Sequence, residues 1–398
     1  MRIAIFTPFI YPFHIDMAST LSKLVNVYVF TCGTFGNYPF DEFLAKKYVV
    51  KLNCVNIISS DRIMVPWEAL KFLKYRPHIS IIFGSESLAG ILLYFLSRLI
   101  RAKTIVIVEE NYVTTMKGLL KKILQSMKRT LVKITYKSAD ILVAESHASK
   151  KYVLKVLHVK RTKPLIVMVH GVDTKKFSKR LSISRDVAKR IVVEKLNMPN
   201  DNLVKKRWCT FIGEPSYAKG ITILLDAIEL ISKHGSITPN ECVFLIPKLK
   251  ILRDRKDLRP IYQRKLSQLH ITGYIVMYPL LEHNLMPLLY RASDIVVIPS
   301  VLIKNGSSDR SPNVALEALA SGCIIIASYV GGIPTIVGDA AILVKPNDPY
   351  ALAIKLCQVL SDYEKYKYLE EKARKRAINE LDIRLYSYAL LELLARLY

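Results

Sequence analysis

The chain has 398 residues and a formal charge of +26, from 59 lysines and arginines against 33 acids. Hydrophobic residues make up 51% of it, with 15 glycines and 18 prolines, which excludes a disordered, collagen-like or low-complexity protein. Six scattered cysteines without a Cys-x-x-Cys pair favour neither a disulfide framework nor a zinc site, so a reducing cytoplasm fits best.

The first part of the chain alternates short apolar runs with helix-length segments. Runs of Val, Ile and Phe that are typical of buried parallel strands lie at residues 3–6, 27–30, 79–83, 104–108, 141–143 and 165–169. The first run follows Met1 and Arg2 directly, so we expect a strand there rather than a signal peptide. Between these runs, residues 88–100 form an amphipathic stretch that is too short to span a membrane.

One segment, residues 116–137, is rich in lysine and arginine and contains no acid. Its apolar residues recur at helical spacing and its basic residues take the other faces, which predicts a basic amphipathic helix. Two interpretations are open. Either the helix packs on the core with a solvated basic side, or it docks on an anionic membrane surface, where each basic residue contributes about 1 kcal/mol.

The alternation restarts after a polar, basic stretch at residues 178–206. Strands are predicted at 208–212, 243–246, 271–275, 295–298 and 323–327, helices at 221–233 and 314–321, and a helical tail at 362–398. Two such halves predict an α/β protein with two Rossmann-like, doubly wound domains that face a central cleft. We place the N-terminal domain at 1–168 and the C-terminal domain at 169–375, and we expect residues 376–398 to form a helix that returns to the N-terminal domain.

The most informative segment follows the strand predicted at 295–298. Ser311 suits a helix N-cap and Pro312 the first helical position, so a helix N-terminus should lie just after the carboxyl end of a strand. The backbone N–H groups and the dipole at such an end favour a phosphate. Asn313 and Glu317 are four residues apart and share one helix face, where a carboxylate near a bound diphosphate can accept hydrogen bonds from a ribose diol.

Several segments of the C-terminal half, in this order, resemble the retaining glycosyltransferases of family 4, the group 1 glycosyltransferases of GT-B fold. They are 170–177 (HGVDTKKF), 211–213 (FIG) with Lys219-Gly220, 289–294 (LYRASD) with 299–300 (PS), 316–322 (LEALASG), 331–334 (GGIP) and 344–348 (VKPND). The resemblance covers residues 165–355, whereas over residues 1–160 it is only architectural. Neither Gly-x-Gly-x-x-Gly nor a Walker loop is present, which disfavours dinucleotide binding and simple nucleoside-triphosphate hydrolysis.

The resemblance implies a retaining, metal-independent hexosyltransferase that needs no cofactor. It would move a sugar from a nucleotide-diphosphate sugar to a lipid-linked or glycan acceptor. By the same resemblance, Lys219 contacts the donor diphosphate, Glu317 the nucleotide ribose, and Asp309 the transferred sugar. The donor site is expected to include Gly213, Arg310, Ser311 and Asn313 as well. Fixed cations and a helix N-terminus would stabilise the charge that develops on the leaving diphosphate.

The sequence departs from the family pattern in three places. Gly213 is followed by Glu214 where the family has an arginine, and we expect Arg310, Lys248 or Lys250 to compensate. Glu109-Glu110 stand where a histidine commonly follows the strand at 104–108, so one of the two is a catalytic candidate. The stretch after the first strand lacks a Gly-Gly loop and offers His14 and Asp16 as acceptor-side candidates. For each of these residues the alternative is a purely structural role.

Two other functions are open. Glu214 and the missing histidine would also suit a catalytically weak GT-B scaffold with a binding or regulatory role. Nucleic-acid binding through the positive charge lacks a basic–aromatic motif, so no nucleic-acid partner is expected. We expect a cytoplasmic protein, with peripheral association at the inner membrane face if the acceptor is lipid-linked.

Overall fold

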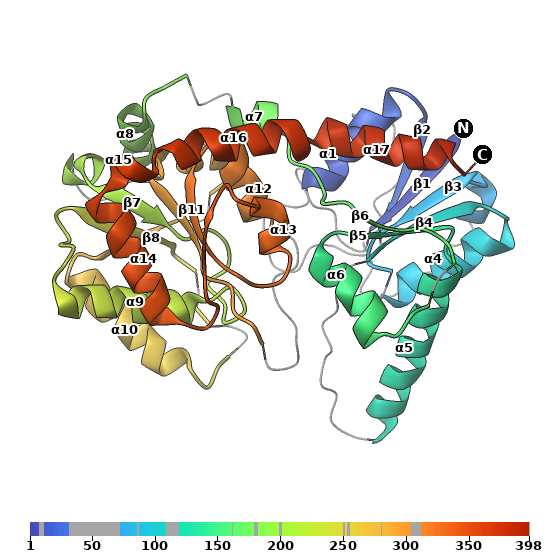
Figure 1. Cartoon of the computed structure of the whole chain (residues 1–398), viewed down its shortest axis with the longest axis horizontal. Helices are drawn as coiled ribbons and strands as arrows, with labels where there is room; N and C mark the ends of the chain where they lie inside the picture. The colour runs from blue at the N-terminus through green and yellow to red at the C-terminus, as the bar shows by residue number, and fades with distance from the viewer. Residues whose placement is uncertain are drawn as a thin grey trace. The chain divides into compact units, whose positions relative to one another are not determined.

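The computed structural model describes residues 1–7, 12–31, 72–85, 87–108, 119–160, 162–178, 182–198, 201–249, 251–252, 255–279, 281–303 and 312–397. They form two compact units, drawn in Figure 1. Unit 1 contains Met1–Gly171 and Ile383–Tyr398, and unit 2 contains Val172–Asp382. The chain therefore passes between the units after residues 171 and 382, where the sequence predicts residues 168 and 375.

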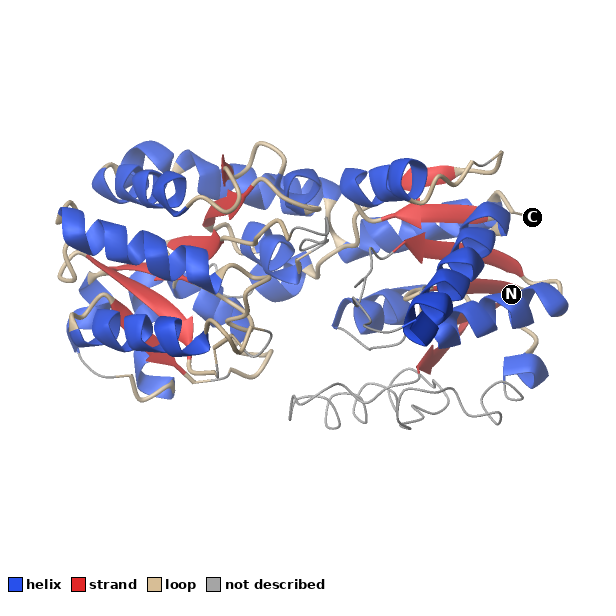
Figure 2. Ribbon diagram, turned by 90° about the horizontal axis from the view of Figure 1, so that it is seen from below, coloured by secondary structure: helices blue, strands red, loops and turns tan. Residues whose placement is uncertain are grey.

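Unit 1 is built on a parallel six-stranded sheet with the strand order β2-β1-β3-β4-β5-β6. Its strands are β1 (Arg2–Thr7), β2 (Asn26–Thr31), β3 (Ile79–Ile82), β4 (Lys103–Val108), β5 (Ile141–Ala144) and β6 (Leu165–Val167). Its helices are α1 (Pro12–Ser22), α4 (Leu88–Leu99), α5 (Leu119–Ser138), α6 (His147–Lys151) with the π-helix η1 (Tyr152–Val156), and α17 (Ile383–Ala395). Helices cover both faces of the sheet (Figure 2), which explains why the strands are almost continuously apolar.

Alternate residues of β1 enter two separate cores, because successive side chains of a strand point to opposite faces. Ile3 and Ile5 belong to a cluster that includes residues of α1 and α17, whereas Ala4 and Phe6 belong to one that includes residues of α4 and α5. Leu390 of α17 is fully buried in the first cluster. The last described helix thus completes the core of unit 1, while the helix before it, α16 (Tyr368–Glu380), lies in unit 2.

The predicted basic amphipathic helix is present as α5, but most of its apolar stripe does not pack on the core. Among the described side chains of α5, those of Val132, Thr135 and Tyr136 are buried, and Leu131 of the predicted stripe packs against the same core. In contrast, Ile123 and Met127 of the predicted stripe are exposed. The interpretation of a core-packed helix is therefore correct for α5 as a whole, but wrong for most of the stripe that was expected to face the core.

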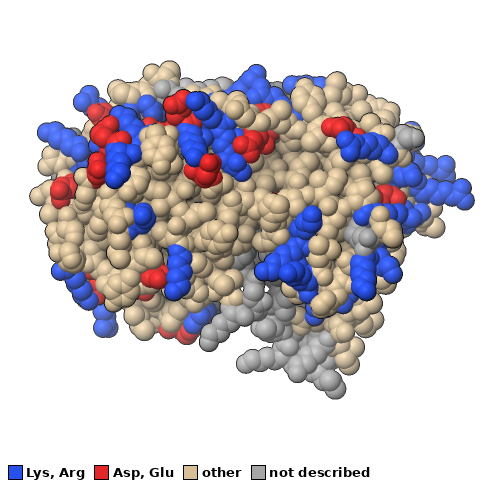
Figure 3. Space-filling view, viewed as in Figure 1, with Lys and Arg blue, Asp and Glu red and all other residues tan. Residues whose placement is uncertain are grey.

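Acidic residues are distributed unevenly between the units. Over the described residues 87–108, 119–160 and 162–172 the only acids are Asp140 and Glu145, among many lysines and arginines. Most of the acidic side chains on the face drawn in Figure 3 lie over unit 2, on the left. None of the helices in the described ranges is long and apolar enough to cross a membrane.

Unit 2 has a second parallel six-stranded sheet, with the order β12-β11-β10-β7-β8-β9. Its strands are β7 (Arg207–Thr210), β8 (Cys242–Pro247), β9 (Ile275–Tyr278), β10 (Ile295–Ile298), β11 (Ile324–Ser328) and β12 (Ile342–Val344). Besides α16, its helices are α7 (Thr174–Ser178), α8 (Arg185–Lys195), the 3-10 helix η2 (Asp201–Lys205), α9 (Ile221–His234), α10 (Arg259–Ile271), α11 (Met286–Ala292), α12 (Asn313–Ala320), α13 (Ile333–Val337), α14 (Pro349–Ser361) and α15 (Tyr363–Tyr366).

One strand of unit 2 lies later in the chain than predicted. Residues 271–275 are predicted as a strand, but Ile271 is the last residue of α10 and only Ile275 belongs to β9. Gly273, at φ 81°, turns the chain between the two elements, and such a left-handed conformation interrupts either kind of regular structure. The prediction of two successive β/α halves is confirmed.

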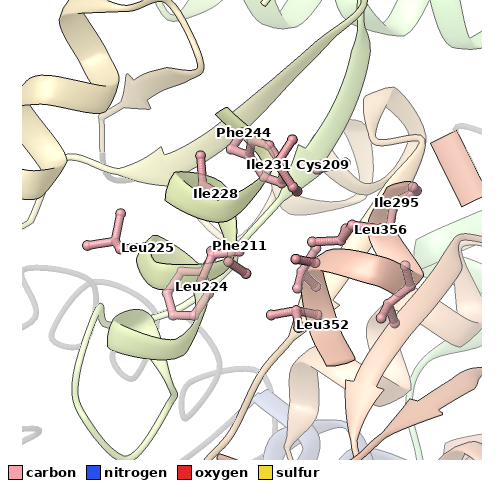
Figure 4. Close-up of a cluster of buried hydrophobic side chains, with 14 of the residues drawn as sticks. Cys209, Phe211, Leu224, Leu225, Ile228, Ile231, Phe244, Ile295, Leu352 and Leu356 are labelled. Atoms are coloured by element: carbon pink, nitrogen blue, oxygen red, sulfur yellow. The ribbon is translucent and has the colours of Figure 1, made fainter. Parts of the chain in front are cut away.

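The main core of unit 2 lies between the sheet and the helices α9 and α14 (Figure 4). Leu224 and Ile228 of α9 are four residues apart, on the helix face that packs against Phe211 and Phe244. Leu356 of α14 is also fully buried in this cluster. This packing fixes the start of α9 relative to the carboxyl end of β7.

A buried ionic cluster around Asp294 joins α8 to the sheet at the opposite end of β10. The carboxylate of Asp294 is fully buried and lies 2.7 Å from Lys189 Nζ and 3.0 Å from an Arg207 guanidinium nitrogen. It also accepts the backbone N–H of Trp208 at 2.8 Å. Lys189 is only 3% exposed, and although burial lowers its pKa, Asp294 favours the charged form. Asp294 and Lys189 thus neutralise each other's charge, since either charge would be strongly unfavourable if it were buried without a partner.

Candidate active site

The strand order of unit 2 brings two loops together. β7 and β10 are neighbours, and the chain continues from β7 to β8 on one side and from β10 to β11 on the other. In open parallel sheets, ligands bind outside the carboxyl ends of the strands at such a reversal of strand order. The loops concerned are residues 211–220, which lead into α9, and the segment that begins at Pro299 and leads into α12.

The two loops touch through their backbones. Gly220 has φ 77°, and a Cβ added to it would lie 1.8 Å from the carbonyl oxygen of Pro299. Next to this contact, Val301 N–H donates to the carbonyl of Ala218 at 3.1 Å. Because only glycine permits both this conformation and this approach, Gly220 sets the distance between the loops.

The loop after β7 leaves room for an anion. Gly213 has φ 112°, and apart from its chain neighbours no atom lies within 4 Å of the position of an added Cβ. The backbone of Gly213 is exposed there, and Lys219 is partly exposed just before α9 begins. An open glycine, a lysine and a helix N-terminus are features that bind phosphate groups.

Glu317 is held by a buried tyrosine. It lies one turn into α12, and the hydroxyl of Tyr290 in α11 donates to its Oε2 at 2.8 Å. Tyr290 itself is fully buried, and burial, together with the nearby carboxylate, raises the pKa of its hydroxyl. Asn313 shares the same helix face as Glu317, as predicted.

Aromatic rings pack next to Tyr290. The ring of Phe177, in α7, stands edge-on to Tyr290 with ring centroids 5.8 Å apart. The ring of His283 also stands edge-on to Phe177, with ring centroids 6.3 Å apart. Burial lowers the pKa of His283 to about 4, with a further contribution from the charge of Lys176. His283 is therefore neutral at physiological pH.

Acid should weaken unit 2 through His283. The unfolded chain binds a proton on this histidine below about pH 6.5, whereas the folded protein binds it only near pH 4. The unfolded state holds more protons over that interval, so the free energy of unfolding should fall by about 2–3 kcal/mol as the pH drops through it. Urea unfolding between about pH 7 and pH 5 measures this slope. A His283→Gln variant with an unchanged slope would contradict the assignment.

Several of the predicted site residues lie outside the described residues. These are the catalytic candidates Asp309, Glu109 and Glu110, the donor-site residues Arg310 and Ser311, and the compensating cation Lys250. α12 begins at Asn313 with Pro312 in the N-cap position, one residue later than expected. Of the other residues named for phosphate chemistry, Glu214 is partly exposed beside Gly213, and Lys248 is exposed at the carboxyl end of β8.

The acceptor-side candidates lie in unit 1, at the start of α1. His14 is only 3% exposed, and its ring packs on Phe13 and Phe83 with centroids 3.9 and 4.7 Å apart. Burial, followed by the proximity of His170, keeps the pKa of His14 well below its usual value. Asp16 is partly exposed. A neutral, buried His14 has a packing role here, whereas the carboxylate of Asp16 is reachable from solvent.

A second pair of polar residues at the same end of the unit 1 sheet was not singled out from the sequence. Glu145 follows β5 directly, and its Oε1 lies 3.5 Å from Nδ1 of His170. Both side chains are buried. In the described ranges, no group of three or more His, Cys, Asp or Glu residues could hold a metal ion.

Comparison with known proteins identifies the type of domain that unit 2 contains. Residues 206–362 match the family model described as "Glycosyl transferases group 1". Unit 2 is a group 1 glycosyltransferase domain. An uncharacterized glycosyltransferase of Methanocaldococcus jannaschii is 26% identical over 244 residues, which are 61% of this chain and 56% of the relative.

A D-inositol 3-phosphate glycosyltransferase of Salinispora arenicola is 28% identical over 54% of this chain and 45% of its own length. The chain thus aligns with about half the length of the curated relatives it matches. Among solved structures, Anabaena HepE in complex with UDP superposes with a TM-score of 0.74 at 14% identity, over 100% of both chains. A glycosyltransferase from Rickettsia africae gives 0.69 at 17% identity, over 98% of this chain and 97% of its own. These structural likenesses confirm the GT-B fold that the motifs predict.

The sequence carried no signal for the role of Tyr290. It lies 27 residues before Glu317, on another helix, and only the tertiary fold joins the two side chains. A general expectation could have flagged it, because a tyrosine buried on an apolar helix needs a partner for its hydroxyl.

Proposed function

We propose that this group 1 glycosyltransferase moves a hexose from a nucleotide-diphosphate sugar to a lipid-linked or glycan acceptor. One observation carries the donor part of the proposal. The loop of Gly213 and Lys219, the N-terminus of α9 and the Tyr290–Glu317 pair all lie at the reversal of strand order in unit 2. This arrangement offers a cation and backbone N–H groups for a diphosphate, and a fixed carboxylate for a ribose.

The same groups suit the chemistry of transfer. Cleavage of the glycosyl–phosphate bond leaves negative charge on the diphosphate, and Lys219 with the helix N-terminus would stabilise that charge more as it develops. We propose that this happens without a metal ion and with retention at the anomeric carbon. Nuclear magnetic resonance of the first-formed product tests retention, since an inverted anomeric configuration would contradict it.

We further propose that the protein works in the cytoplasm and, for a lipid-linked acceptor, at the inner face of a membrane. The scarcity of acids over the described residues 87–108, 119–160 and 162–171 of unit 1 supports an anionic surface as its partner. Structures of the Anabaena neighbour contain UDP or UDP-glucose, so a uridine-diphosphate sugar is the first donor to test.

The decisive test is a thermal-shift screen against UDP-, GDP- and ADP-sugars, first without metal and then with it. Ligand at about 100 times its Kd should stabilise the protein by nearly 3 kcal/mol. In Glu317→Ala, affinity for the preferred nucleotide should fall roughly 10- to 100-fold, because a charged hydrogen-bond acceptor is lost. Glu371→Ala, at an exposed residue of α16, is the matched control. Equal nucleotide binding by both variants would contradict the site.

Tyr290→Phe keeps Glu317 but removes the hydroxyl that positions it, so this variant tests the positioning alone. Without the hydroxyl, the carboxylate loses this hydrogen bond and is held less firmly, and we expect nucleotide affinity to fall about fivefold to tenfold. Tyr274→Phe is the control, since the Tyr274 hydroxyl is also buried and donates to a backbone carbonyl, that of Ile237, at 2.9 Å. Isothermal titration of both variants measures the effect. A loss of equal size in Tyr274→Phe would indicate general destabilisation instead.

Glu214 favours a second function, a catalytically weak scaffold with a binding or regulatory role. Its carboxylate follows Gly213, where developing negative charge would be better served by a cation. Such a scaffold would bind the nucleotide sugar tightly yet show neither transfer nor slow hydrolysis of the donor. Glu214→Arg should then raise hydrolysis, whereas a wild-type protein that already turns over its donor excludes this function.

A further inference from the structure

The outward face of α5 is apolar. Ile123, Met127 and Ile134 are spaced four and seven residues apart, so they form one line along the helix, and each is between 45% and 59% exposed. The buried Val132 and Tyr136 follow Ile123 and Met127 by nine residues, which is two and a half turns. The exposed stripe therefore points directly away from the core of unit 1.

The neighbours of α5 also expose apolar side chains. On α4, Leu92, Phe95 and Leu99 recur at helical spacing and are exposed, as is Leu154 of η1. α4 is joined to α5 by a hydrogen bond between the hydroxyls of Tyr94 and Ser138, and η1 by one from Arg129 to the carbonyl of Val156. Most of the exposed large hydrophobic residues described in unit 1 belong to these three elements.

Cations lie along one side of the stripe and no acid opposes them. Lys137 lies about 60° and Lys133 about 100° around α5 from the stripe, whereas Lys128 lies toward the buried Thr135 and Val132. The two acids in the surrounding described residues are both engaged, Asp140 with Arg98 and Lys163, and Glu145 with the buried His170. An apolar stripe with lysines along one side matches the boundary between anionic headgroups and acyl chains.

We propose that unit 1 docks on an anionic lipid surface through α5, with Ile123, Met127 and Ile134 inserted between the lipids and the neighbouring lysines on the headgroups. A helix that were only solvated would expose polar residues along this line, and a helix packed on the core would bury them. The length and composition of α5 place it along the surface rather than across the membrane. This inference names the membrane contact of the proposed function, but it does not depend on the donor site.

Vesicle flotation of the full chain, without nucleotide, tests the proposal. The chain should float with vesicles of phosphatidylcholine and phosphatidylglycerol, but not with phosphatidylcholine alone, and less as salt is raised. The triple variant Ile123→Ser, Met127→Ser, Ile134→Ser keeps every charge and should bind at least about tenfold more weakly. Neutralising Lys133 and Lys137 to Gln keeps the stripe and should also weaken binding about tenfold.

Ile261→Ser with Ile354→Ser is the matched control, because both residues are exposed on helices of unit 2. Three outcomes would overturn the proposal: no flotation with anionic vesicles, unchanged binding by the triple variant, or an equal loss in the control. A concentration-dependent dimer that the triple variant abolishes, without vesicle binding, would assign the stripe to a second copy of the chain. Nucleotide binding in the thermal-shift screen reports on the donor site separately, so the failure of either proposal can be recognised.

Discussion

Gly220→Ala is expected to abolish nucleotide binding and to lower the free energy of unfolding by about 2–4 kcal/mol. The new methyl group would stand 1.8 Å from the Pro299 carbonyl oxygen, a distance that requires the two loops to separate. It would also force an L side chain to adopt φ 77°. Since the loops after β7 and β10 together form the donor site, their separation should remove the site as well as stability.

Gly235→Ala is the control for this prediction. Gly235 ends α9 with a similar φ of 69°, but nothing lies within 4 Å of the position of an added Cβ. It should therefore cost about 1 kcal/mol and leave nucleotide binding intact. Both variants strain the backbone, but only Gly220→Ala also collides with Pro299. Urea unfolding and nucleotide titration of the two variants therefore separate the effect of the collision from that of the strain. Equal costs would mean that the contact with Pro299 has no special importance.

Asp294→Ala is expected to destabilise the protein by about 3–5 kcal/mol, because it leaves the buried ammonium of Lys189 without its counter-charge. The backbone N–H of Trp208 would lose its acceptor at the same time. Asp226→Ala removes a carboxylate that is 27% exposed and pairs with Lys265, and should cost about 1 kcal/mol or less. Denaturant unfolding compares the two.

A double variant distinguishes loss of the charge pair from loss of volume. Replacing both partners, as Asp294→Leu with Lys189→Met, removes the unpaired ammonium and should recover part of the stability, while Arg185 and Arg207 still lose this carboxylate. A double variant that is less stable than Asp294→Ala would show that shape and the surrounding hydrogen bonds dominate. Because Asp294 precedes β10 at the end away from the donor loops, nucleotide affinity of the folded fraction should change little.

Most of the architecture could be predicted because both sheets are covered by helices. Strands buried on both faces must be apolar throughout, so runs such as 104–108 and 295–298 stand out from the amphipathic segments between them. The strand predicted at 271–275 was wrong because the run is short and apolar residues fill helix ends as readily as strands. β12 was missed for a similar reason, since three residues give no period to recognise.

Side-chain partnerships were harder to predict than elements. Periodicity predicts that α5 is amphipathic, but it cannot tell which of two apolar lines meets the core, because Val132 and Met127 are equally apolar. The motif identified Glu317, the acceptor of the hydrogen bond, from the sequence. Its donor Tyr290 could be identified only from the structure, where α11 packs on α12. Lys219 and Glu317 remain predictions in their roles toward a donor, which the nucleotide screen tests.

The position of α17 has a consequence for biosynthesis. During translation, the strands of unit 1 emerge first, yet the core that contains Met17 and Leu21 also needs Tyr386 and Leu390. Those residues leave the ribosome only after the whole of unit 2. Unit 1 must therefore wait with one face of its sheet covered by α1 but not by α17 while unit 2 is synthesised and folds. A nascent chain stopped before Ile383 would leave the α17 side of that core open to chaperones, so α17 closes the core of unit 1 only after unit 2 has been made.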